Sequence, residues 1–114
     1  MDIEMLRKIC SSLPAATEDV KWGNDLVFSV GDKMFCAASL VPPFNCSFKV
    51  NDEEFDELSN RSGFMAAPYM ARAKWVLVTD AAKLSKKEWE TFIKQSYELV
   101  RAKLTKKLRR DLNI

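Results

Sequence analysis

The segment Trp-Val-Leu-Val-Thr at residues 75–79 is the densest run of β-branched and aromatic residues in the chain. Such residues favour a β-strand, in which successive side chains point to opposite faces of a sheet. Alternation then places Trp75 and Leu77 on one face and the two valines on the other. Because both faces carry apolar side chains, we expect a central strand with neither face simply open to water.

In the rest of the chain, segments with helical periodicity alternate with segments that have strand periodicity. Helical spacing of apolar residues predicts a first helix at about 3–12 and a second helix that begins after Asn51, a good N-cap. Alternating apolar residues bounded by turn signals predict four further strands, at about 17–22, 26–30, 34–40 and 46–50.

A capping box formed by Ser85 and Glu88 predicts the start of a long third helix. The apolar stripe of this helix ends at Leu104 and is interrupted by Ser96, where we expect the helix to lie close to the sheet. Residues 105–114 lie beyond the stripe, so we expect them to project from the body or to fray.

The length of 114 residues predicts one domain, spanning 1–114 and ending in a basic helical extension at about 105–114. The order of elements is helix, a run of strands, helix, strand and long helix. This order predicts an α+β fold, a two-layer antiparallel sheet with helices packed on one face. The other face of the sheet would be open to solvent or to a partner.

Histidine is absent from the chain. Its absence removes Ser-His and Cys-His nucleophile pairs, histidine general bases and zinc sites with histidine ligands, so we expect neither enzyme activity nor a cofactor. Three cysteines without CxxC spacing indicate reduced, buried thiols. The first residues do not resemble a signal peptide, and no apolar run approaches the ~20 residues of a membrane span. We therefore expect a cytoplasmic protein with no membrane partner.

The positive charge is concentrated in the last third of the chain. Residues 1–80 carry 8 Lys/Arg and 12 Asp/Glu, whereas residues 81–114 carry 10 and 4, within a total net charge of +2. The basic tail could contact the phosphates of a nucleic acid. The alternative is a solvated helix end whose cations suit the negative end of the helix dipole, and the sequence alone favours it. The tail consists of Arg101, Lys103, Lys106, Lys107, Arg109 and Arg110.

A second candidate surface is the open face of the sheet, where aromatic and cationic residues could stack on bases or hold a partner. It would consist of Trp22, Lys49, Tyr69, Arg72, Lys74 and Trp75. The alternative places both tryptophans in the core. Residues 52–57 are acidic but lack the glycine-containing loop and ligand spacing of a calcium site, so we expect a solvated helix start and no metal.

The most specific blocks of the sequence are Pro68-Tyr69-Met70, Lys74-Trp75-Val76 and Ser96-Tyr97-x-Leu99-Val100. Together with Leu13-Pro14, Trp22-Gly23 and Gly31-x-Lys33-x-Phe35, they resemble the MmcQ/YjbR family of small bacterial proteins, in order and over nearly the whole chain. The resemblance implies a CyaY-like fold similar to that of frataxin, and a "double-wing" mode of DNA binding.

The sequence departs from the family pattern at two places. Many relatives carry histidines where this chain has Met70 and Lys74, so no histidine-based role transfers. Relatives often have Leu-Pro-Lys-Lys near the end, where this chain has Leu-Thr-Lys-Lys at 104–107. Loss of that proline predicts that the third helix runs on and extends its basic end as a rod.

The leading hypothesis is a non-enzymatic DNA-binding protein, a monomer or weak dimer, that binds weakly through the backbone. Its phosphate contacts would be Lys106, Lys107, Arg109 and Arg110, assisted by Lys49, Arg72 and Lys74. The alternative is a protein-interaction or adaptor module that uses the open face around Trp22, Tyr69 and Trp75. A third hypothesis is a ligand-binding regulator with a pocket between the sheet and the third helix.

Overall fold

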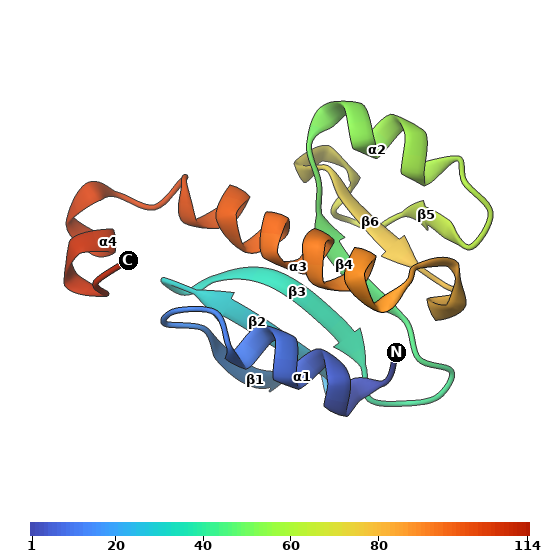
Figure 1. The fold of residues 1–114 in the computed structure, drawn as a ribbon, viewed down its shortest axis with the longest axis horizontal. Coiled ribbons are helices and arrows are strands. Elements are labelled where there is room, and N and C mark those ends of the chain that lie inside the picture. Colours follow the sequence, from blue (N-terminus) through green and yellow to red (C-terminus); the bar gives the residue numbers. More distant parts are fainter.

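A single antiparallel sheet with helices on one side organises the computed structural model, which describes residues 1–114 (Figure 1). The elements in chain order are α1 (Ile3–Ser11), β1 (Thr17–Lys21), β2 (Asp25–Val30), β3 (Lys33–Ser39), β4 (Cys46–Lys49), α2 (Asp52–Ser59), β5 (Phe64–Ala66), η1 (Ala71–Ala73), β6 (Trp75–Val78), η2 (Ala81–Lys83), α3 (Lys86–Arg101) and α4 (Lys106–Asp111). The strand order is β1-β2-β3-β4-β6-β5. The two-layer α+β prediction is confirmed.

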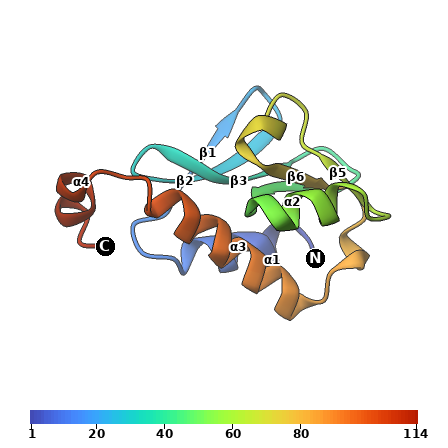
Figure 2. The same cartoon turned by 90° about the horizontal axis from the view of Figure 1, so that it is seen from above.

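The two faces of the sheet differ in what covers them. Figure 2 shows α1, α2 and α3 on one side, while the β1–β2 turn and the η1 segment rise on the other. None of the helices combines the length and apolar character needed to cross a bilayer.

Capping residues begin the helices where the sequence predicts. The Asp2 carboxylate accepts a hydrogen bond from the Met5 backbone N–H at the start of α1. Asn51 with Glu54 and Ser85 with Glu88 form capping boxes at α2 and α3. These caps satisfy backbone N–H groups that have no partner within the helix, which fixes the first turn.

Strand β6 separates its side chains as the alternation predicts. Val76 and Val78 join the main core beneath the helices, whereas Trp75 and Leu77 face the other way. The strand lies between β4 and β5 and pairs with both, so it is an interior strand of the sheet, as predicted. The edge strand β5 was missed because three residues, Phe64–Ala66, are too few to show alternation.

Ser96 joins α3 to two strands at once, as its place in the apolar stripe predicts. Its hydroxyl donates to the Phe35 carbonyl at 2.6 Å and accepts from the Lys49 backbone N–H at 2.9 Å. The residue is fully buried, so both backbone groups would lack a partner without it.

The chain end differs from the prediction of one long basic rod. Helix α3 ends at Arg101, and the Thr105 hydroxyl accepts from the Leu108 backbone N–H to begin a separate helix, α4. Leu108 packs against the core above Gly31, where an added Cβ would lie 2.8 Å from a Leu104 methyl group and 3.1 Å from a Leu108 methyl group. The absent proline therefore does not extend α3, because burial of Leu108 folds the chain back. Figure 1 shows α4 beyond the end of α3, beside the β2–β3 turn.

Candidate functional site

Three lysines from distant parts of the sequence surround one hollow of about 460 Å³, and we call them the lysine cluster: Lys49, Lys74 and Lys103. Lys49 ends β4, Lys74 follows η1, and Lys103 follows α3. The remaining wall comes mainly from the beginning of α2, including Asp52 and Glu53. The hollow therefore joins the sheet layer to the carboxyl end of α3.

Nearby negative charge compensates the Lys49 ammonium only in part. Burial, followed by the positive charge of Lys103, lowers the pKa of the Lys49 ammonium, and Asp52 acts weakly in the opposite direction. The Lys49 ammonium donates to the Ala73 carbonyl, which holds it at the surface of η1. Lys74 has a left-handed backbone (φ 64°), and its ammonium lies 5.0 Å from the centre of the Phe55 ring. These contacts fix two of the three cations in place.

The predicted basic tail is divided into three parts. Arg101 donates to the terminal carbonyl of Ile114 and so anchors the chain end. Lys103 joins the lysine cluster, and the remaining four residues lie on α4. Within α4, Lys106, Arg109 and Arg110 line a shallow hollow of about 360 Å³, while Lys107 is exposed elsewhere on the same helix. Arg72 lies on η1, exposed and outside the lysine cluster.

A second hollow, of about 560 Å³, lies on the face of the sheet opposite the helices; we call it the open-face hollow. Its floor crosses three strands, because Ser47 of β4 stands opposite Ala37 of β3 on one side and Leu77 of β6 on the other. Because the side chains of Ser47 and Ala37 are small, the sheet surface forms a depression there. The walls are Trp22, in the β1–β2 turn, and the segment 68–70.

Two large aromatic side chains stand exposed at the walls of this hollow. Trp22 is 67% exposed and Tyr69 fully exposed, and both have left-handed backbones, with φ 53° and 66°. This conformation is uncommon for bulky residues because Cβ approaches the backbone. Both residues were predicted for a partner face, and the structure brings them to one hollow.

The third predicted residue of that face, Trp75, is only 5% exposed. The Ala67 N–H donates to the Trp75 carbonyl, and the Trp75 N–H donates to the Met70 carbonyl, so the segment between them closes over the start of β6. Trp75 therefore supports the wall and is not available to a partner, which corrects the prediction of an exposed indole.

Sequence reasoning missed the remaining polar groups of the open-face hollow. Asp25 is half-buried at the base of the β1–β2 turn, and its carboxylate forms neither an ion pair nor a hydrogen bond. Asn45 and Ser47 supply the other polar side chains. A signal did exist: Ala37 and Ser47 are small residues facing away from the core in adjacent strands.

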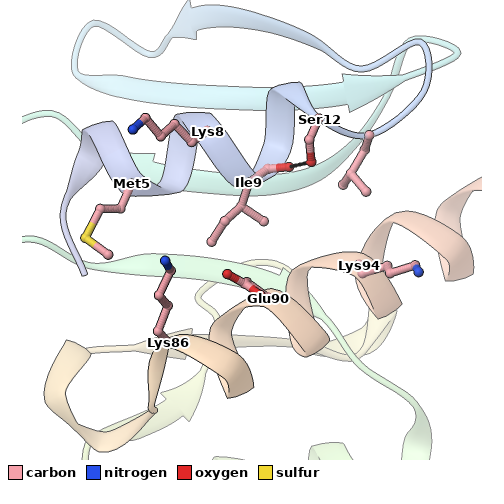
Figure 3. Close-up of a pocket in the computed structure, with 8 residues that line it drawn as sticks. Met5, Lys8, Ile9, Ser12, Lys86, Glu90 and Lys94 are labelled. Carbon is pink, nitrogen blue, oxygen red and sulfur yellow. Dashed lines mark hydrogen bonds between the residues drawn. The ribbon is translucent and has the colours of Figure 1, made fainter.

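The helix side of the molecule carries a different groove, between α1 and α3, of about 510 Å³ (Figure 3). The α1 side supplies Met5, Lys8, Ile9, Ser12 and Leu13, and the α3 side supplies Lys86, Glu90 and Lys94. The predicted pocket between the sheet and α3 is instead packed. Phe35 meets Tyr97 edge to face at 5.4 Å, and Phe48 stacks on Phe92 at 5.5 Å.

The cysteines and the acidic residues of α2 have structural roles. The sulfur atoms of Cys36 and Cys46 lie 3.4 Å apart in the core, and burial raises the pKa of the Cys36 thiol well above its usual value. The thiolate is therefore disfavoured, as expected for an inert thiol. In α2, the Glu54 carboxylate accepts from Gln95, and Glu57 pairs with Arg61.

Solved structures of other proteins share the fold of this chain. The crystal structure of Deinococcus radiodurans protein DR2400, of the domain family DUF419, matches with a TM-score of 0.88 and 26% identity, over 98% of this chain and 88% of that one. A Pseudomonas syringae protein shares the fold, with a TM-score of 0.74 and 20% identity, over 89% of this chain and 100% of that one. Among curated proteins there is no match. The YjbR family model matches residues 11–99, which is most of the sequence, and the chain therefore belongs to the YjbR family.

Proposed function

We propose that this chain is a non-enzymatic DNA-binding protein that contacts phosphates through the lysine cluster and the neighbouring cations of α4. The observation that carries the proposal is the convergence of Lys49, Lys74 and Lys103 on one hollow, where Lys103 adds to the effect of burial in lowering the pKa of Lys49. The ammonium groups repel one another, and an anion bound among them reduces that repulsion. Lys103 and Lys106 are three residues apart across the α3–α4 turn, so a nucleic acid bound at the lysine cluster would have the cations of α4 within a few residues of chain.

The binding is weak and directed to the backbone. Lysine and arginine neutralise phosphates and release counterions, which makes the affinity depend on salt. With about 4 to 6 phosphates engaged, the logarithm of the association constant falls with the logarithm of salt concentration at a slope near −4 to −5.

The test measures that slope by fluorescence anisotropy with a short DNA duplex. The variant Lys49→Gln/Lys74→Gln/Lys103→Gln removes the lysine cluster and should make the slope shallower by about 2 to 3 units. The helix groove supplies a matched control, Lys8→Gln/Lys86→Gln/Lys94→Gln, with the same change in net charge. The control should keep the slope. Equal losses in both variants, or a wild-type affinity independent of salt, would contradict the proposal.

A second candidate function, a protein-interaction module, is favoured by the exposure of Trp22 and Tyr69 at one hollow. Exposed aromatic side chains beside an apolar depression are typical anchors of protein interfaces. The test captures proteins from a cell lysate with the immobilised chain and identifies them by mass spectrometry. These proteins should no longer be captured by the variant Trp22→Ala/Tyr69→Ala. They should be retained with Val20→Ala/Met65→Ala, which removes exposed apolar residues outside the hollow. Capture of the same proteins by both variants would exclude this function.

A further inference from the structure

The open-face hollow combines apolar walls with one uncompensated charge. Seven of its eleven lining residues are hydrophobic, and Asp25 is its one charged residue. Lys21 stands opposite Asp25 in the β1–β2 register but is exposed and forms no ion pair with it. The half-buried Asp25 carboxylate is therefore a negative charge without an ion-pair partner.

The two exposed aromatic side chains give the hollow a second feature that favours positive charge. The face of an aromatic ring carries negative electrostatic potential and attracts ammonium groups, most strongly for Trp. Trp22 and Tyr69 are both held in left-handed backbone conformations that disfavour bulky side chains. Six non-glycine residues of the chain have positive φ, and the two aromatic ones among them both lie at this hollow. Such strain occurs often at functional sites.

We infer that the open-face hollow binds a small organic cation: an alkylated ammonium group attached to an apolar body. The ammonium lies between the aromatic walls and the Asp25 carboxylate, and the apolar body covers Met34, Met70 and Leu77. Asn45 and Ser47 supply hydrogen-bonding groups that orient it. The volume of about 560 Å³ falls within the range typical of small-molecule sites.

Other ligand classes fit the hollow less well. A phosphate or carboxylate ligand would be repelled by Asp25 and would find no cationic side chain among the lining residues. A calcium or magnesium ion requires about six oxygen ligands, and the hollow offers one carboxylate among mainly apolar groups. The site is thus distinct in charge from the lysine cluster, and it does not depend on whether the protein binds DNA.

The test compares three ring compounds of similar size with different charge: phenyltrimethylammonium, benzyl alcohol and benzoate. Binding is followed by NMR through the backbone amides of Ala37 and Leu77 in the floor. Phenyltrimethylammonium should shift both amides saturably and bind more tightly than benzyl alcohol, whereas benzoate should bind least. Equal or tighter binding of benzoate, or the absence of a saturable shift with the cation, would overturn the inference.

Matched variants separate charge from shape. Asp25→Asn keeps the size of the side chain and should weaken cation binding about tenfold. Lys21→Gln removes the cation opposite Asp25 in the strand register and should tighten binding. Trp22→Ala should weaken binding by about 2-fold to 30-fold, and Tyr69→Phe, which keeps the ring, should leave it nearly unchanged. Because only the backbone of Asp25 takes part in the sheet and its carboxylate makes no hydrogen bond, Asp25→Asn should retain the native fold and amide spectrum. Unchanged affinity in that variant would contradict the inference.

Discussion

The lysine cluster and the open-face hollow belong to one chain of 114 residues but carry opposite charge. The first places three cations together with part of the α2 amino end, and the second places one carboxylate among aromatic and apolar side chains. The net charge of +2 hides this separation. Ser47 and Lys49 are two residues apart on β4 and so belong to the same face of the sheet. The two hollows therefore differ in charge because of the segments that surround each of them, and not because they lie on opposite faces.

The largest expected effect comes from Ser96, which connects the strands that carry both surfaces. Ser96→Ala removes the partners of the Phe35 carbonyl and the Lys49 N–H, so the free energy of unfolding should fall by about 2 to 4 kcal/mol. Urea denaturation measures this change. Ser12→Ala, which removes one exposed bond to the Ile9 carbonyl, should cost less than about 1 kcal/mol. Equal losses of unfolding free energy in the two variants would contradict the role of Ser96 in connecting α3 to the two strands.

Two glycines allow the surfaces to be perturbed separately. Gly31 lies beneath Leu104 and Leu108, near α4, whereas Gly23 lies in the turn beside Trp22, and both have positive φ angles of 57° and 84°. An alanine at either position bears the left-handed strain, but only at Gly31 does the added Cβ meet other side chains. Gly31→Ala should therefore lower the free energy of unfolding by about 1 kcal/mol more than Gly23→Ala.

Thermal unfolding followed by circular dichroism measures both glycine variants. Hydrogen exchange should increase in α4 for Gly31→Ala and remain unchanged there for Gly23→Ala. An α4 that exchanges equally in the two variants would contradict the packing of Leu108 described above.

A smaller effect tests the strain at the hollow. Trp22→Gly should be more stable than Trp22→Ala by about 1 kcal/mol, because glycine adopts the left-handed backbone without the Cβ penalty. Both variants should lose the cation preference of the hollow. If alanine were the more stable replacement in chemical denaturation, the backbone at Trp22 would not be strained, and strain would not mark the hollow as a functional site.

The smallest effect is electrostatic, at Lys49. Lys103→Gln removes a like charge, so the pKa of Lys49 should rise toward its usual value. In the wild type the pKa of Lys49 is lower in the folded than in the unfolded protein. Stability from this group therefore increases as the pH rises through the folded-state pKa toward 10.5, and it is lost below that window. NMR titration of the Lys49 side chain measures the pKa. An unchanged pKa in Lys103→Gln would contradict an electrostatic interaction between the two lysines.

Local signals predicted most of the fold. The capping boxes at Ser85 and Asn51 and the alternation in β6 placed helices and strands correctly, because these features depend on residues close in sequence. Predictions failed where distant contacts decide. The turn back to α4 depends on Leu108 meeting Leu104 and Gly31, which helical periodicity cannot show.

The candidate surfaces were predictable only in part. Trp22 and Tyr69 were identified as exposed aromatics, but the burial of Trp75 depends on the return of the segment 67–74 over β6. Asp25 was missed because a single acidic residue near a turn carries no motif. The union of Lys103 with Lys49 requires the register of α3 against the sheet, which no local pattern specifies.

The most direct test of two separate surfaces is to map both ligands by NMR on one sample. The account predicts that a DNA duplex shifts the amides of Lys49, Lys74 and Lys103, whereas phenyltrimethylammonium shifts those of Ala37, Ser47 and Leu77. Each ligand should bind with the other present. Shifts of the same residues by both ligands, or displacement of one by the other, would contradict it.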